Sequence, residues 1–302
     1  MLVCFVLALS MRFALGKGML INVTGEGLFS LLYLALYALA FGLPCFVYCL
    51  IRKKAPGKVC IKGFKVGFVP FIFVSALLLI CLVCLEKYFF AYTFSYAPES
   101  ELVHNLRPAV VLLAFCLVPA VFEEILFRGV LQSEYSRFGG GVTGIIICAF
   151  LFAIWHFDLP YFLVYFTAGL VLGVITHVTG SVFASILAHF LNNVFANFAS
   201  GWMSFIASER IGGTFLMVVL CAFSFVLLMI QLQMTEKICM KKAVAFAGKE
   251  REHEQGTQGD VKDEKIHFLC EQKQTAKRFF KVLLSPEIVV CAVVYTIVVS
   301  VS

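Results

Sequence analysis

The sequence predicts an all-α fold, a polytopic transmembrane helical bundle of about seven to eight spans. Of its 302 residues, 61% are hydrophobic and 14% are charged, whereas soluble domains carry about 25% charged residues. Apolar runs of about 18 residues or more recur, and each is long enough to cross a hydrocarbon core of about 30 Å. Because one helical bundle can absorb most of such a chain, its length says little about domain number.

The first part of the chain, residues 1–107, is predicted to be an N-terminal membrane segment. Residues 1–22 are apolar but contain Arg12 and Lys17, which leaves both an interfacial helix and a short span open. They show no basic start and no clear cleavage site, so a cleaved signal peptide is not expected. The first clear span covers residues 27–51 and should be kinked at Pro44.

The loop 52–65 contains six basic residues and no acid. The positive-inside rule therefore places it in the cytoplasm. Residues 66–85 then form a span that returns outward, and the polar segment 86–107 fits the outer side.

Residues 108–206 are predicted to hold the core of the protein. Pro108 suits the first turn of a helix, which should run to about Phe138. Glycines 139–141 and the segment 179–181 read as turns, and Asp158 as a helix cap. The expected helices after the first turn cover residues 142–157, 161–178 and 182–206.

The C-terminal part is predicted as an additional transmembrane helix (207–234), a charged cytoplasmic loop (235–287) and a hydrophobic tail or last span (288–302). The loop holds 11 of the 24 basic residues and 9 of the 18 acids. Both basic segments then lie on one side, so the net charge of +6 reports membrane orientation. No nucleic-acid partner is expected, because no basic patch is interleaved with aromatic residues.

Two adjacent glutamates, Glu123 and Glu124, lie inside an apolar stretch, and ionisable groups in lipid usually face a protein interior or a water-filled cavity. Glu124 and Arg128 are four residues apart, with the acid first, which is the favoured order for an ion pair on a helix. Glu123 points about 100° away, so this pair leaves it available. A carboxylate in a poorly hydrated site binds protons more readily than in water, which suits a general base. The plain alternative is a buried ion pair with a spare acid.

Histidines on two later helices can join this acid. The turn at 139–141 lies midway between Glu123 and His156, so an antiparallel hairpin places both at equal depth, and Phe152 shares a helix face with His156. His189 and Asn193 share one face of a further helix. They fit either donors for a developing oxyanion or a polar patch that helps helices associate. The depth of His189 relative to His156 is not fixed by spacing.

Taken in order on successive apolar helices, Glu123-Glu124-xxx-Arg128, Phe152-xxx-His156 and His189-xxx-Asn193 resemble the CAAX prenyl protease and bacteriocin-processing (CPBP) family of intramembrane endopeptidases. The resemblance covers about residues 108–200. It implies that Glu123 and His156 activate water, that His189 and Asn193 stabilise the oxyanion, and that Glu124 and Arg128 are the remaining motif positions.

The cofactor is left open, with none favoured. Glu123, His156 and His189 would give zinc three ligands and an open fourth position, but Asn193 beside His189 suits an oxyanion role better than ligation. The expected partners are the lipid bilayer and a peptide or protein substrate.

The predicted function is an intramembrane endopeptidase that cleaves a membrane-associated protein or peptide, such as a prenylated CAAX-like tail or a bacteriocin leader. A non-catalytic immunity or scaffold protein is one alternative. An ion- or proton-coupled transporter is the other, although no broken helices or related halves are evident.

Overall fold

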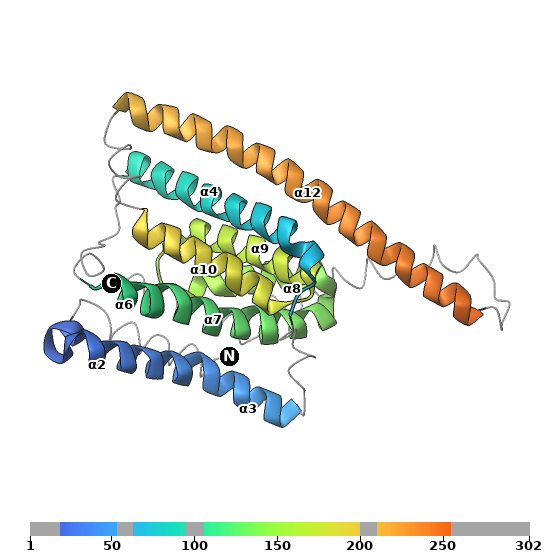
Figure 1. The fold of residues 1–302 in the computed structure, drawn as a ribbon, viewed down its shortest axis with the longest axis horizontal. Helices are drawn as coiled ribbons and strands as arrows, with labels where there is room; N and C mark the ends of the chain where they lie inside the picture. Colours follow the sequence, from blue (N-terminus) through green and yellow to red (C-terminus); the bar gives the residue numbers. More distant parts are fainter. Residues whose placement is uncertain (1–18, 53–62, 95–105, 200–209, 255–302) are drawn as a thin grey trace.

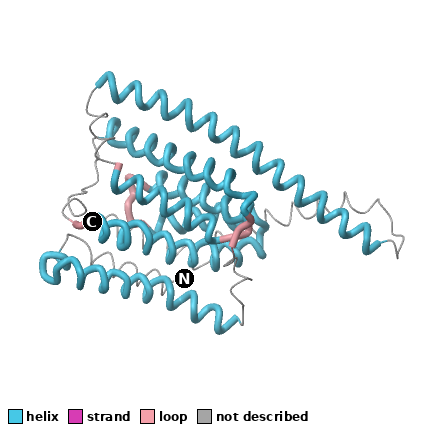
Figure 2. Tube along the Cα trace, viewed as in Figure 1, coloured by secondary structure: helices cyan, strands magenta, loops and turns pink. Residues whose placement is uncertain are grey.

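The computed structural model describes residues 19–52, 63–94, 106–199 and 210–254, and in these ranges the chain is helical with short connections (Figure 2). The predicted all-α class is confirmed. Within the described ranges, five helical stretches are long and apolar enough to cross a membrane: Gly27–Ile51, Val66–Phe90, Pro108–Trp155, Phe162–Thr179 and Gly212–Lys242. The total of seven to eight spans stays a prediction. Whether residues 1–22 and 288–302 span the membrane also stays open, because residues 1–18 and 288–302 lie outside the described ranges.

The helices run side by side along one direction (Figure 1). Their bounds in chain order are α2 (Met19–Tyr37), α3 (Leu43–Arg52), α4 (Val69–Phe94), α6 (Pro108–Val110), α7 (Val118–Glu124), α8 (Ser133–Trp155), α9 (Phe162–Thr179), α10 (Val182–Phe198) and α12 (Arg210–Glu254). The C-terminal ends of α3 and α12 lie at the same end of the bundle (Figure 1).

Three π-helical stretches interrupt these helices, at Ala38–Gly42, Val111–Leu117 and Ile125–Gln132. The first two directly precede segments that contain Pro44 and Pro119. Proline has no N–H to donate and its ring crowds the preceding turn, so a widened turn is an understandable response. The structure shows a π-helical stretch just before Pro44, and the kink expected at Pro44 itself stays a prediction. Turns of π-helix are frequent at functional sites.

Both predicted turns are present. Gly140 has a φ of 85° inside α8, a region that glycine enters without steric cost. The chain reverses direction there, as shown by the edge-to-face contact between Phe127 before the turn and Phe152 after it. Gly180 has a φ of 67° and ends α9 by donating its N–H to the Thr176 carbonyl at 2.7 Å. The Tyr161 N–H reaches the Asp158 carboxylate at 3.2 Å just before α9, as expected of a cap.

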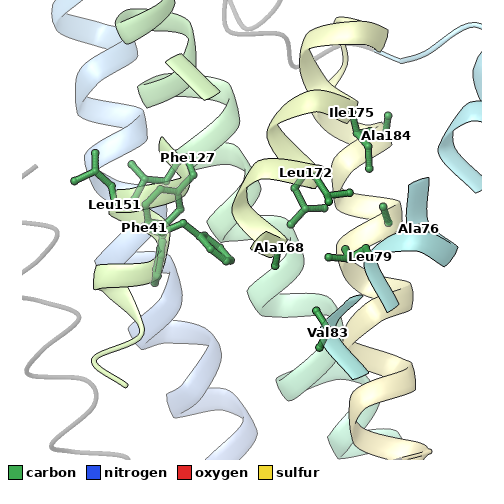
Figure 3. Packing of buried hydrophobic residues seen from close by; sticks show 14 of the residues in the cluster. Phe41, Ala76, Leu79, Val83, Phe127, Leu151, Ala168, Leu172, Ile175 and Ala184 are labelled. Atoms are coloured by element: carbon green, nitrogen blue, oxygen red, sulfur yellow. The ribbon is translucent and has the colours of Figure 1, made fainter. Parts of the chain in front are cut away.

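Close packing of α8 against α9 depends on Gly169. A Cβ at this position would lie 2.7 Å from Ala149 Cα, so only glycine allows the approach. The small-residue spacing of Gly169 and Gly173 therefore marks a helix contact, as in many membrane bundles. Figure 3 shows the core beside it, with labelled side chains from α4 (Ala76, Leu79, Val83), α9 (Ala168, Leu172, Ile175) and α10 (Ala184).

Three expected helix ends are wrong. Helix α4 continues past residue 85 to Phe94, and Glu86, assigned to a polar outer segment, accepts a hydrogen bond from Thr167 of α9 at 2.8 Å. Helix α12 continues past residue 234 to Glu254, and Lys242 on it donates to the Val178 carbonyl at 2.7 Å. In both cases contacts with α9 accompany the extra helical turns. The helix expected over 182–206 ends at Phe198, and 200–209 lie outside the described residues.

Candidate active site

A cavity of about 530 Å³ lies among α2, α4, α7, α8, α9 and α10. The structure brings together the four residues predicted to carry the chemistry, because the lining includes Glu123, His156, His189 and Asn193. Much of the remaining lining is aromatic or aliphatic, including Tyr33, Phe41, Phe115, Trp155 and Leu172. This matches the general form of a small-molecule or peptide pocket, an apolar wall with a few convergent polar groups.

Glu123 on α7 is 4% exposed. Its Oε1 accepts a hydrogen bond of 3.3 Å from the Tyr37 hydroxyl of α2. Its Oε2 has no hydrogen-bond partner among the described residues. A buried carboxylate oxygen without a partner calls for an explanation such as a catalytic role or a bound water.

Glu124 holds a network of its own. Its Oε1 accepts from Arg128 Nη1 at 2.7 Å and from His189 Nδ1 at 2.9 Å. Both Glu124 and the Arg128 side chain are inaccessible to solvent. The predicted ion pair is present, and the separation of roles between the two glutamates follows from it, since Arg128 is bound to Glu124 rather than to Glu123.

The Arg128 guanidinium is also fixed from two other directions. Nη2 donates to the Gly169 carbonyl at 3.2 Å, and the group lies 4.5 Å above the Phe152 ring centre. Phe152, predicted as a supporting residue, thus makes a cation–π contact with Arg128. One turn further, Gln132 Nε2 donates to the Gly173 carbonyl at 3.0 Å, so the two glycines of α9 serve as paired acceptors.

His156 ends α8 and its orientation is fixed by two contacts. Nδ1 lies 2.8 Å from the Phe152 carbonyl oxygen, and because a carbonyl only accepts, Nδ1 carries the hydrogen. The neutral ring then has its basic lone pair on Nε2. Tyr165 of α9 stacks on the imidazole with ring centres 3.7 Å apart.

His189 and Asn193 lie on α10, one helical turn apart. Because Nδ1 of His189 is bound to Glu124, its Nε2 is the nitrogen left to act in the cavity that it lines. Asn193 Nδ2 makes only a long contact, 3.4 Å, to the Cys116 carbonyl, and Asn197 donates to the Asn193 carbonyl at 2.8 Å.

The three residues that could hold zinc, Glu123, His156 and His189, line the same cavity. Among the residues that the structure describes, no group of three His, Cys, Asp or Glu side chains is already gathered closely enough to hold a metal ion.

Among the cavity residues that the sequence analysis did not single out, Tyr37, Lys87 and Tyr165 contact or accompany the predicted site residues. Nothing in the sequence distinguishes these two tyrosines from the many other aromatic residues. Lys87 is noticeable as a cation at the end of an apolar run, but it was assigned to a polar loop.

Comparison with known proteins supports the resemblance. Residues 105–195 match the family model described as type II CAAX prenyl endopeptidase Rce1-like, and this confirms the predicted CPBP resemblance for that part of the chain. No curated protein and no solved structure matches the chain. Several long apolar helices indicate an integral membrane protein.

Replacing Arg128 with alanine should strongly reduce the amount of folded protein. It leaves the Glu124 carboxylate buried beside His189 without its main cation, and breaking such a pair typically costs about 3–5 kcal/mol. Expression in membranes and thermal unfolding in detergent would measure the effect.

The matched control is the double variant Glu124→Gln with Arg128→Met, which removes both charges. It should recover part of the lost stability. A single Arg128→Ala variant of normal abundance and normal melting temperature, but without activity, would instead assign Arg128 to the chemistry.

Proposed function

Starting from the Rce1-like match, we propose that this chain is an intramembrane endopeptidase that cleaves a peptide bond in a membrane-associated substrate. The observation that carries the proposal is a single cavity lined by Glu123, His156, His189 and Asn193, all inside the matched segment. We further propose a prenylated CAAX-like tail as the substrate class, since the matching family is described by that name. A bacteriocin leader is the second candidate.

Glu123 would act as the general base. Its carboxylate removes a proton from water, and the resulting hydroxide attacks the carbonyl carbon of the scissile peptide. Burial and the Tyr37 hydrogen bond support this role, because they orient one oxygen and leave Oε2 without a partner in the described residues.

His156 would take part in the proton transfer. With Nδ1–H bonded to the Phe152 carbonyl, Nε2 is the atom that gains and loses the second proton. When the carbon–nitrogen bond breaks, the proton taken from water passes to the leaving amine, directly from Glu123 or through His156. The stacked Tyr165 ring supports a fixed imidazole plane during this transfer.

The oxyanion formed by the attack would be held by Asn193 Nδ2 and His189. Because His189 Nδ1–H is bound to Glu124, Nε2 can donate only when the ring is protonated. Glu124 fixes the orientation of the imidazole through the 2.9 Å contact between its Oε1 and His189 Nδ1. Glu124 would therefore contribute to the chemistry indirectly, by directing His189 Nε2 to the cavity.

The chain organisation follows the same proposal. We assign residues 108–206 as the catalytic core, 1–107 as an N-terminal membrane segment and 207–234 as an additional transmembrane helix. We place loop 52–65 in the cytoplasm, together with segment 235–287, the first part of which is the helical end of α12. The charge excess of 52–65 supports this orientation.

Glu123→Gln should lower turnover of a prenylated peptide by about 10²- to 10⁴-fold, because it removes the basic carboxylate and keeps the shape of the side chain. Purified protein in detergent and cleavage followed by mass spectrometry would measure it. Glu86→Gln is the matched control, because Glu86 is also a largely buried carboxylate in a membrane helix but does not line the cavity. It should retain activity.

Wild-type turnover by Glu123→Gln would contradict the proposal. A scaffold protein would keep its cellular phenotype in this variant, and a transporter would change ion or proton flux without any cleavage. Activity that persists after exhaustive chelation would exclude the zinc version.

Asn193→Ala and His189→Ala should each lower kcat by about 10²- to 10³-fold if they donate to the oxyanion. Asn197→Ala is the control, since its amide bonds to the Asn193 carbonyl rather than lining the cavity. Single-turnover kinetics would measure the chemical step. A raised KM with unchanged kcat would make both residues substrate-binding groups instead.

Labelling of Cys60 and Cys270 tests the orientation. Each lies in one of the two loops, and each can be restored singly to a cysteine-free variant. In sealed vesicles of known orientation, an impermeant maleimide should reach both from the cytoplasmic face. Accessibility of the two from opposite faces would mean that the number of spans between them is odd rather than even.

A further inference from the structure

Lys87 on α4 lines the same cavity as Glu123 and His156. It lies outside the matched segment 105–195, so it belongs to the part of the site that the family model does not cover. Lys87 lies within the candidate membrane span Val66–Phe90. A lysine inside a membrane span is costly, and such residues usually face a protein interior or a water-filled cavity. The position of Lys87 therefore calls for a role.

The residues around Lys87 do not explain its position in the cavity. Within the described ranges it forms no hydrogen bond or ion pair, and Asp158 is the acid that acts on it electrostatically. One oxygen of Asp158 already accepts the Tyr161 N–H. The charges that act on Glu123 are His189, Glu124 and Arg128, so Lys87 is not the counter-ion of the proposed base.

A cavity with a base in one place and a separate cation in another suits a substrate that has a reacting bond and an anion. A Cys-a-a-X tail ends in a free α-carboxylate. Each residue spans at most about 3.3–3.6 Å, so this carboxylate lies within about 10 Å of a bond cut beside the cysteine. Taking a carboxylate out of water is costly unless a cation receives it.

We propose that Lys87 binds the C-terminal carboxylate of the peptide substrate. The proposal rests on the protease function inferred above and adds to it a specificity-determining residue. The ammonium group would select a free chain end, and the distance between Lys87 and Glu123 would select the bond to be cut. Internal peptide segments, which carry no terminal carboxylate, would be excluded on the same ground.

The test compares two farnesylated peptides of one sequence, one with a free C-terminal carboxylate and one with a C-terminal amide. Wild type should cleave the acid with a kcat/KM about 10- to 100-fold above that of the amide, the range of a hydrogen bond between charged groups. Lys87→Met should lose this preference by slowing only the acid, and Lys87→Arg should keep most of it. Lys65→Met, an exposed lysine at the start of the same helical segment, should leave the preference unchanged.

Equal cleavage of the acid and amide by wild type would overturn the role of Lys87 and leave the protease function intact. So would an undiminished preference in Lys87→Met. If Lys87→Met does not fold, as judged by thermal unfolding, the wild-type preference and the Lys87→Arg variant decide the matter.

A binding experiment tests the carboxylate site separately from the protease function. The last three residues of the peptide, as acid and as amide, are titrated against Glu123→Gln protein with and without Lys87→Met. Tighter binding of the acid that depends on Lys87 supports the carboxylate site even where wild type cleaves neither peptide, and equal binding overturns it. Absence of cleavage by wild type counts against the protease function alone.

Discussion

The arrangement of the site depends on one buried cation. Arg128 binds Glu124 on its own helix, the Gly169 carbonyl on α9 and the Phe152 ring on α8. A guanidinium is always charged and presents a rigid fork of donors, so it fixes three helices at once. Glu124 also accepts a hydrogen bond from His189, whereas Glu123, about 100° around the helix, lines the cavity and accepts from Tyr37. The bond to Arg128 therefore adds to the difference between the environments of the two adjacent glutamates.

Glycine makes that arrangement possible. Gly169 and Gly173 allow α9 to approach α8 closely, and their carbonyls accept from Arg128 and Gln132. Backbone carbonyls inside a helix already accept one hydrogen bond, and a second donor reaches them only where no side chain stands in the way. Small residues in a membrane helix are usually explained by van der Waals packing. Here they also expose acceptors to a charged neighbour.

The local part of the site could be predicted from sequence. The spacing of Glu124 and Arg128 predicts the ion pair, and the glycine turn predicts the hairpin that brings Glu123 and His156 to one cavity. The partner of His189 could not be predicted, because it depends on how α10 tilts against α7, and periodicity reports which face a residue occupies but not which helix it meets. Tyr37 and Lys87 were missed for a similar reason, since each reaches the cavity from a helix far away in the sequence. Lys87 was also misassigned because the apolar run ends before the helix does, and contacts with α9 rather than hydropathy accompany the last turns of α4.

The contact between Tyr37 and Glu123 joins α2, which lies outside the family-matched segment, to the proposed base. Tyr33 and Phe41 complete the same wall of the cavity. A fragment limited to residues 105–195 would therefore keep every motif residue and still lose the wall of side chains that covers Glu123. The matched segment does not enclose the cavity by itself, so the helices that precede it help to set the shape of what can enter.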